Sequence, residues 1–205
     1  MSSRFEKSLI LVMVFPCLAI AGCTYQAGYN PAYVPDEDTQ FLSHQRAVLW
    51  ISSEQANYVY DEHPSNFLGS GTSLSIPLGV ILSNVSAEVL RDRFSGGVGF
   101  ANKQPPGSKC CITLAPSIRR MDYKHHRSGW NYTASIELDL HVEFIDKSAQ
   151  SFFKHTYSSG VVHTPEYAGW SQESADEVSA LVHRTIYELL EAAFDDARQL
   201  IIQRL

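Results

Sequence analysis

This sequence of 205 residues contains few basic residues. Sixteen Lys and Arg stand against 22 Asp and Glu, which gives a net charge of −6, and no run of like charges occurs. A chain of this charge is a poor candidate for binding nucleic acid or anionic lipid headgroups by electrostatics. The sequence also lacks a glycine-rich phosphate loop, a nucleophile elbow and an HExxH pattern. We therefore expect no enzymatic activity. A hydrolase stays the alternative, because a Ser-His-Asp set is defined by geometry and leaves no fixed spacing.

Long apolar runs are missing as well. The run from Leu9 to Ala21 falls short of the ~20 residues that a membrane-spanning helix needs. It follows Arg4 and Lys7 and ends in small residues, and this order is the layout of a secretory signal. The sequence therefore predicts a cleaved signal over residues 1–22.

The residues Ile20-Ala21-Gly22-Cys23 resemble the lipobox of bacterial lipoproteins. The resemblance implies cleavage before Cys23 and acylation of that residue, and several acyl chains on one cysteine give firm anchoring. Thr24 follows, at the position where enterobacterial lipoproteins retained in the inner membrane carry Asp. The resemblance therefore implies the outer membrane, on its periplasmic side. Apart from this covalent lipid, no cofactor is expected.

The part of the chain after the signal reads as a short tether followed by one domain. Residues 23–205 number 183 and carry 14 basic and 21 acidic side chains, a net charge of −7. This length can bury a core without disulfide staples. Residues 24–44 show no helical or strand period and contain several Pro and Gly. We expect a lipidated N-terminus and flexible tether over 23–44, and a single periplasmic domain over 45–205. The tyrosines of the tether could instead pack on the domain or on a partner.

Periodicity predicts an α+β domain in which an antiparallel sheet of about four strands packs against two helices as a two-layer sandwich. The clearest strand covers residues 132–144, where apolar and polar residues alternate strictly. Pro116 interrupts an earlier strand and suggests an edge or a bulge. The expected elements are strands at 46–52, 111–123, 132–144 and 152–162 and helices at 78–94 and 174–203, with loops at 54–70, 98–109 and 164–171 and a turn at 125–129.

An adjacent pair of cysteines, Cys110 and Cys111, remains after Cys17 leaves with the signal and Cys23 takes the lipid. The pair has several interpretations in an oxidising periplasm. It could form a vicinal disulfide with a strained local ring, bind a metal, or link to another chain. It could also begin a strand as two buried reduced thiols, which behave as small hydrophobes.

Two histidines suggest a candidate metal site. His141 lies between acidic neighbours on the polar face of its strand, and His155 lies on the returning strand. A turn centred on Ser148 would place the two imidazoles opposite each other, and with a carboxylate they could bind Zn²⁺ or Cu²⁺. A slip of one residue would change the pairing. The alternative is a plain polar sheet face.

Three aromatic residues beside the predicted hairpin, Trp130, Tyr167 and Trp170, would suit an exposed interface. They could equally be core aromatics that cap the sandwich. The polar and aromatic loop at 54–70 is a second candidate for binding, since long loops often carry function.

The domain resembles the YajG-type outer-membrane lipoproteins and, more loosely, the auxiliary lipoproteins of envelope ABC transporters. The shared features are the lipobox, a helix before the sheet, a Tyr-rich alternating hairpin and a C-terminal amphipathic helix. In this sequence they are Ile20–Cys23, Leu78–Phe94, Asn131–Tyr157 and Ser174–Ile202. The loop at 54–70 and the Cys110-Cys111 pair depart from the pattern. The resemblance implies a non-enzymatic accessory or assembly role and transfers no site residue except Cys23.

Together these features predict a lipid-anchored envelope protein that supports a transport, secretion or surface-appendage complex. Its expected partners are the membrane, through the lipid, and an envelope protein or a second copy of the chain. The alternative is a periplasmic lipoprotein that binds a small ligand or a metal.

Overall fold

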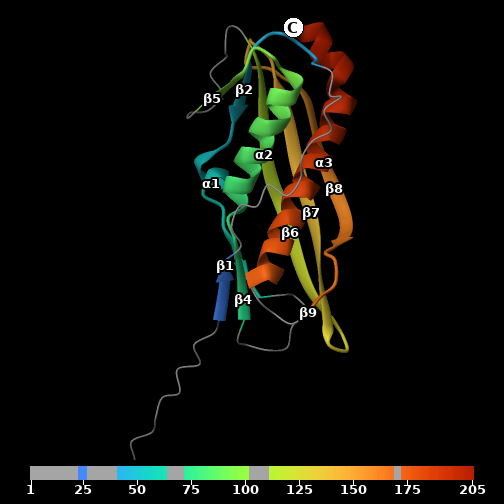
Figure 1. Cartoon of the computed structure of the whole chain (residues 1–205). Helices are drawn as coiled ribbons and strands as arrows, with labels where there is room; N and C mark the ends of the chain where they lie inside the picture. Colours follow the sequence, from blue (N-terminus) through green and yellow to red (C-terminus); the bar gives the residue numbers. More distant parts are fainter. Residues whose placement is uncertain (1–22, 27–40, 64–71, 102–110, 169–171) are drawn as a thin grey trace, which may run out of the picture.

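The computed structural model describes residues 23–26, 41–63, 72–101, 111–168 and 172–205. The described part is an elongated α+β domain with a main sheet, a small second sheet and two long helices (Figure 1). The strands are β1 (Cys23–Gln26), β2 (Ala47–Trp50), β3 (Tyr60–Glu62), β4 (Thr72–Ile76), β5 (Val98–Ala101), β6 (Ile112–Ser128), β7 (Asn131–Ile145), β8 (Ser151–His163) and β9 (Tyr167–Ala168), and the helices are α1 (Ser53–Ala56), α2 (Leu78–Arg93) and α3 (Gln172–Arg204).

The main sheet has the strand order β5-β2-β6-β7-β8, and β9 adds to the end of β7. Strand β2 runs parallel to both β5 and β6, whereas β6, β7 and β8 form an antiparallel meander. The α+β class is therefore confirmed, but the expectation of a purely antiparallel sheet is wrong. The parallel pairs arise because the chain passes through α2 between β2 and β5, and a parallel pair needs a crossover of this kind.

The two long helices cover one face of the main sheet. Helix α2 lies against β2, β5 and β6, and α3 lies against β7 and β8. Along β7 the even-numbered residues from Ala134 to Phe144 are buried, which confirms the alternation that the sequence predicts. The aromatic rings of Phe94, Phe144 and Phe194 meet between the layers. Within the described residues, no helix combines the length and the hydropathy needed to cross a bilayer.

The small sheet contains the N-terminal strand β1. Strand β1 pairs in parallel with β4, with Cys23 opposite Thr72, and β3 pairs antiparallel with β4. Within the described residues, 23–26 thus form a paired strand; residues 27–40 lie outside the described part, so the flexible tether over 23–44 stays a prediction. Further on, the Leu42 N–H donates to the Arg93 carbonyl at 2.8 Å, so contacts with the domain also precede residue 45.

Short elements occupy parts of the predicted loops. Helix α1 and strand β3 lie within 54–70, and β5 lies within 98–109; residues 64–71 and 102–110 are outside the described part. These elements have only three or four residues each, too few to show a period. The predicted turn at 125–129 is also wrong at its start, because β6 continues to Ser128. The helices expected at 78–94 and 174–203 and the strand expected at 152–162 are confirmed.

Pro116 lies inside β6, a central strand, where it pairs with Val142 of β7. The last pair between β2 and β6 is Leu49 with Leu114. Beyond Leu114, β2 no longer pairs with β6. A proline, which has no N–H, therefore costs little stability at position 116. The irregularity in β6 comes slightly later, between Ile118 and Arg120.

Candidate functional site

The face of β6, β7 and β8 that points away from the helices is polar. We call it the open face. Its members alternate with the core residues along each strand and are paired across the strands. They are Ser117, Arg120, Asp122 and Lys124 from β6, Glu137, Asp139, His141 and Glu143 from β7, and Lys154, Thr156 and Ser158 from β8. The open face is thus a direct product of the alternation that the sequence predicts.

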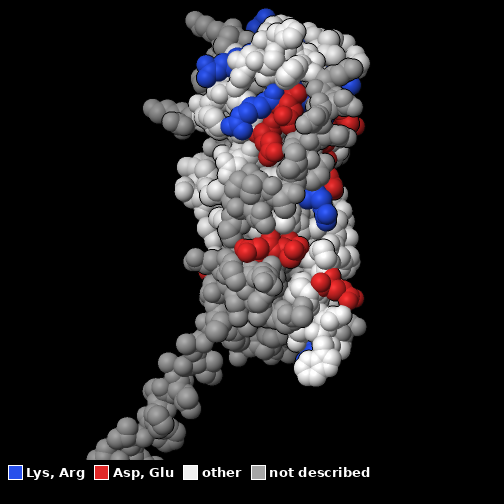
Figure 2. All heavy atoms as spheres, in the orientation of Figure 1, with Lys and Arg blue, Asp and Glu red and all other residues white. Residues whose placement is uncertain are grey.

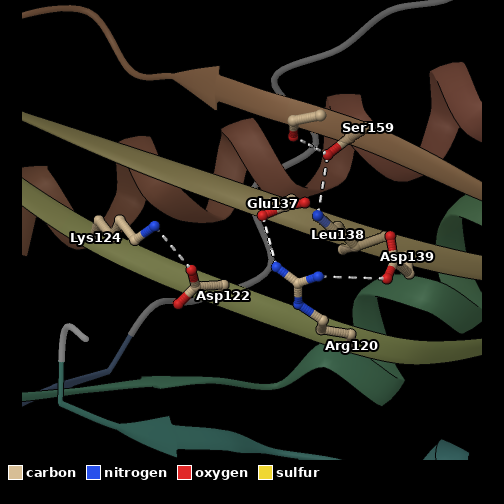
Figure 3. A network of polar contacts seen from close by, with 8 residues as sticks. Arg120, Asp122, Lys124, Glu137, Leu138, Asp139 and Ser159 are labelled. Carbon is tan, nitrogen blue, oxygen red and sulfur yellow. Dashed lines mark hydrogen bonds and ion pairs between the residues drawn. The ribbon is translucent and has the colours of Figure 1, made fainter. Parts of the chain in front are cut away.

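Ion pairs cross the open face (Figure 3). Arg120 Nη2 lies 2.6 Å from Glu137 Oε2, and its Nη1 lies 4.0 Å from Asp139 Oδ2. Beside them, Lys124 Nζ lies 3.2 Å from Asp122 Oδ2. The Arg120 side chain is 52% exposed, so these pairs add little to stability. They do give the open face closely spaced charges of both signs.

The helix side of the molecule differs from the open face. Figure 2 shows this side, where the described acidic and basic side chains form small neighbouring groups between uncharged residues. One pair, Arg93 with Glu191, ties α2 to α3. The Tyr157 hydroxyl donates to Asp196 Oδ2 at 2.8 Å and ties β8 to α3. Polar contacts on this side therefore join elements within the domain.

Strand β8 is an edge of the main sheet, and a bulge interrupts it. The Leu138 N–H donates to the Ser159 hydroxyl at 3.0 Å, and that hydroxyl donates to the Gly160 carbonyl at 2.6 Å (Figure 3). Gly160 has φ +61°, a left-handed conformation that glycine adopts without strain. Bulges of this kind twist an edge away from further pairing. Strand addition by a partner is therefore disfavoured at this end of β8.

The two histidines of the candidate metal site lie on opposite faces of the sheet. The register pairs His141 with Thr156 and His155 with Val142, so the predicted pairing is off by one residue and is wrong. His141 Nδ1 lies 3.0 Å from Thr156 Oγ1, while His155 packs edge-on against Tyr157 at the helix-side rim. Burial and the positive charge of Arg119 lower the pKa of His141. Among the residues that the structure describes, no three His, Cys, Asp or Glu side chains gather as a metal site.

Cys111 directly precedes β6, is buried and is disulfide-bonded. Cys110 lies outside the described residues. Because the structure describes only one member of this pair, the vicinal disulfide stays a prediction. A small-ligand site in the loop at 54–70 also stays a prediction.

Trp130 stands at the tip of the β6–β7 hairpin and is 88% exposed. It follows Gly129, whose φ of +64° allows the tight reversal. The Arg127 Nε donates to the Gly129 carbonyl at 3.0 Å and braces the turn. Trp130 is therefore not one of the core aromatics that the sequence left as an alternative. Trp170 lies outside the described residues.

Three rings stack behind this tip. His125 and Tyr132 are parallel at 5.0 Å between centroids, and Tyr167 stacks on Tyr132 at 6.4 Å. Strand β9 places Tyr167, because it pairs directly with Tyr132. The Arg127 guanidinium lies 5.7 Å above the Tyr132 ring. Burial, and to a lesser degree His126, lower the pKa of His125. Tyr167 thus supports the hairpin end from behind.

No protein-family model matches the sequence, and no curated protein matches it. Among solved structures, a protein of family DUF330 from Xanthomonas campestris matches with a TM-score of 0.52 and 12% identity, over 87% of this chain and 98% of that one. A minor lipoprotein from Acinetobacter baumannii has a TM-score of 0.38 and 10% identity, over 76% and 94% of the two chains. Rare lipoprotein B from Shewanella oneidensis has a TM-score of 0.36 and 9% identity, over 77% and 97%.

The first of these matches defines the fold. DUF330 is the family of ABC-transport auxiliary lipoproteins, and this chain shares its fold over nearly the whole length of the Xanthomonas protein. The resemblance to envelope lipoproteins that the order of elements indicated is thus confirmed at the level of the fold.

The β6–β7 hairpin extends further than the sequence predicts. His125 and His126 are expected in a turn, whereas both lie on β6. The signal that could have shown this is weak, since Tyr123, His125 and Arg127 do alternate with charged or polar neighbours but include no aliphatic residue. Gln55, whose side chain bonds the backbone of β6, carries no sequence signal.

Proposed function

We propose that the chain is a lipid-anchored protein of the bacterial envelope with an accessory role in a multi-protein complex. The observation that carries this proposal is the fold: the domain that follows the lipobox cysteine resembles a DUF330 protein over 98% of that protein's length. The accessory role, the lipid and the periplasmic side of the outer membrane belong to the proposal. A transport complex is the kind of assembly that the family's description favours.

The lipid is proposed to hold the domain close to the bilayer. Acylated Cys23 would be the first residue of the mature chain, and it is also the first residue of β1, which pairs with β4. An anchor attached to a paired strand leaves little freedom between lipid and sheet. The domain would therefore keep a defined orientation toward the membrane.

The open face is proposed to bind the protein partner. The helices occupy the other face of the same sheet, and the open face carries charges of both signs. Charge complementarity of this kind supplies specificity and speeds association more than it adds affinity. A partner with a matching arrangement of acidic and basic side chains would fit it.

Site-specific photo-cross-linking in intact cells tests this assignment. A photoreactive amino acid replaces Lys154 or Thr156, which are exposed on the open face. The matched control positions are Arg184 and Glu188, which are exposed on α3. We expect the same envelope protein to be captured from both open-face positions, and its yield to fall when Arg120→Glu reverses the central charge.

Two results would contradict the proposal. Products that form only from the α3 positions would place the partner on the helix side. A chain that yields no specific product from any of the four positions, while fractionating with membranes, would count against an accessory role.

A further inference from the structure

We propose that the tip of the β6–β7 hairpin is a membrane-contact site, at which the Trp130 indole enters the interfacial layer of the bilayer that holds the lipid anchor. The inference rests on the proposed acylation of Cys23 and adds a second, non-covalent contact to it. The two contacts would fix the tilt of the domain and thereby the direction in which the open face points.

The position of the tip is the first argument. Strand β1, whose first residue is Cys23, enters the molecule at the end where β9 and the β6–β7 hairpin tip also lie, and the C-terminus lies at the opposite end (Figure 1). The pairing of β9 with Asn131 and Tyr132 confirms that β9 marks the hairpin end. An acyl group on Cys23 therefore brings this end of the long axis to the bilayer.

The chemistry of Trp130 is the second argument. The side chain is 88% exposed, more than any other large hydrophobic side chain among the described residues, where Phe100 comes next at 60%. An indole combines an apolar ring with one N–H donor. It is therefore most stable where the ring is in an apolar environment and the N–H can still bond to water or a polar group. Tryptophan is accordingly enriched at membrane–water interfaces.

The rigidity of the tip is the third argument. Gly129 adopts φ +64° and its carbonyl accepts a hydrogen bond from Arg127 Nε at 3.0 Å. Behind the turn, the stack of His125, Tyr132 and Tyr167 extends the ordered structure to the end of the hairpin. On the other side of the turn, Asn131 Nδ2 donates to Glu166 Oε2 at 2.8 Å. A tip that is already ordered loses little conformational freedom when it enters an interface.

Charge does not drive this contact. The mature chain is acidic, so long-range attraction to anionic lipids is not expected. The contact is instead local: the apolar ring enters, and the exposed Arg127 beside it remains at headgroup level, as cationic side chains near interfaces do. Insertion should therefore occur in vesicles made only of zwitterionic lipid.

The test uses the full chain, purified with its native lipid and reconstituted into phosphatidylcholine vesicles whose acyl chains carry bromine at defined depths. Bromine quenches nearby tryptophan emission. We expect bromine close to the headgroups to quench the wild type, and Trp130→Phe to remove more than half of the quenchable emission. Trp50→Phe, which changes a half-buried tryptophan in β2, is the matched control and should leave the quenching unchanged.

The outcomes separate this inference from the proposed function. If palmitate labelling shows an acylated chain but Trp130→Phe leaves the quenching unchanged, the membrane contact is refuted while the anchored accessory protein stands. If a photoreactive residue at position 130 forms cross-links in cells to a protein and none to lipid, the tip is a protein-binding site and the inference fails. A chain without acylation refutes both proposals.

Discussion

The side-chain amide of Gln55 makes two hydrogen bonds to the backbone of Ile118, 63 positions further along the chain. Gln55 Nε2 donates to the Ile118 carbonyl at 3.2 Å, and the Ile118 N–H donates to Gln55 Oε1 at 2.8 Å. The amide thus takes the place of a neighbouring strand on β6, beyond the point where pairing with β2 ends. Ile118 is buried, so its backbone groups need such partners.

Replacing Gln55 should therefore destabilise the domain. Gln55→Ala leaves two backbone groups of β6 without partners, and we expect the free energy of unfolding to fall by about 1–3 kcal/mol. Urea denaturation measures the loss. The control is Asn57→Ala, which removes only an exposed hydrogen bond to the carbonyl of Ser53, the first residue of α1, and should change the unfolding free energy by less than about 0.5 kcal/mol. Equal effects of the two variants would contradict the role given to Gln55.

The aromatic cluster between the layers should carry a much larger share of the stability. Phe194 packs against Phe144 at 4.9 Å and Phe94 at 6.3 Å between ring centroids, and all three are buried. Phe194→Ala should cost about 3–5 kcal/mol through lost burial and the cavity left behind.

Phe100 is the matched control for this loss, because its ring is 60% exposed on the edge strand β5. Phe100→Ala should stay within about 0.5 kcal/mol of the wild type in the same denaturation experiment. A small loss for Phe194→Ala would mean that α3 is not packed as described.

Stability should also depend on pH through His183. This histidine of α3 is fully buried, with its Nε2 3.5 Å from Glu88 Oε2 of α2. Burial lowers the pKa of His183 from its ordinary value of 6.5. The unfolded chain then binds a proton more readily than the folded one, so the unfolding free energy falls as the pH drops below about 6.5, by at most about 1.4 kcal/mol per pH unit.

His183→Gln should remove this part of the pH dependence, whereas the exposed His155→Gln should retain it. Burial raises the pKa of Glu88, so protonation of Glu88 raises the unfolding free energy at lower pH and opposes the effect of His183. The variants should therefore be compared between about pH 5 and 7. Parallel curves for the wild type and His183→Gln would show that the folded and unfolded states hold this proton equally well.

The sorting of the protein should depend on Thr24. If the outer-membrane proposal is right, Thr24→Asp should move the chain from the outer to the inner membrane fraction, because an Asp directly after the lipidated cysteine retains enterobacterial lipoproteins there. Sucrose-gradient fractionation and immunoblotting measure the distribution. Thr24→Ser is the control and should leave it unchanged; an unaffected Thr24→Asp variant would refute the predicted sorting.

The sequence predicts the long elements well because each has enough residues to show a period. The sequence of β7 alternates from Tyr132 to Phe144, and α2 and α3 each carry an apolar stripe that the structure buries. Elements of three or four residues, such as β3 and β5, leave no such trace. A local sequence pattern also cannot predict which strands pair over a long distance. The parallel neighbours of β2 depend on where the chain returns after the α2 crossover.

The candidate sites were harder to predict for the same reason. A bulge at the start of β8 shifts its register by one residue, and that single step moves His155 to the face opposite His141. Trp130 was identified from its residue type, but its exposure depends on β6 running on to Ser128. Exposure at a hairpin tip is a property of the whole fold.

Metabolic labelling with radioactive palmitate shows whether Cys23 carries the lipid anchor. The wild type, Cys23→Ser and Cys17→Ser are expressed side by side, immunoprecipitated and compared by gel mobility and label. We expect label on the wild type and on Cys17→Ser, and an unlabelled, slower-migrating precursor for Cys23→Ser. Label that persists on Cys23→Ser would contradict the lipid anchor at this residue, and with it the orientation proposed for the whole domain.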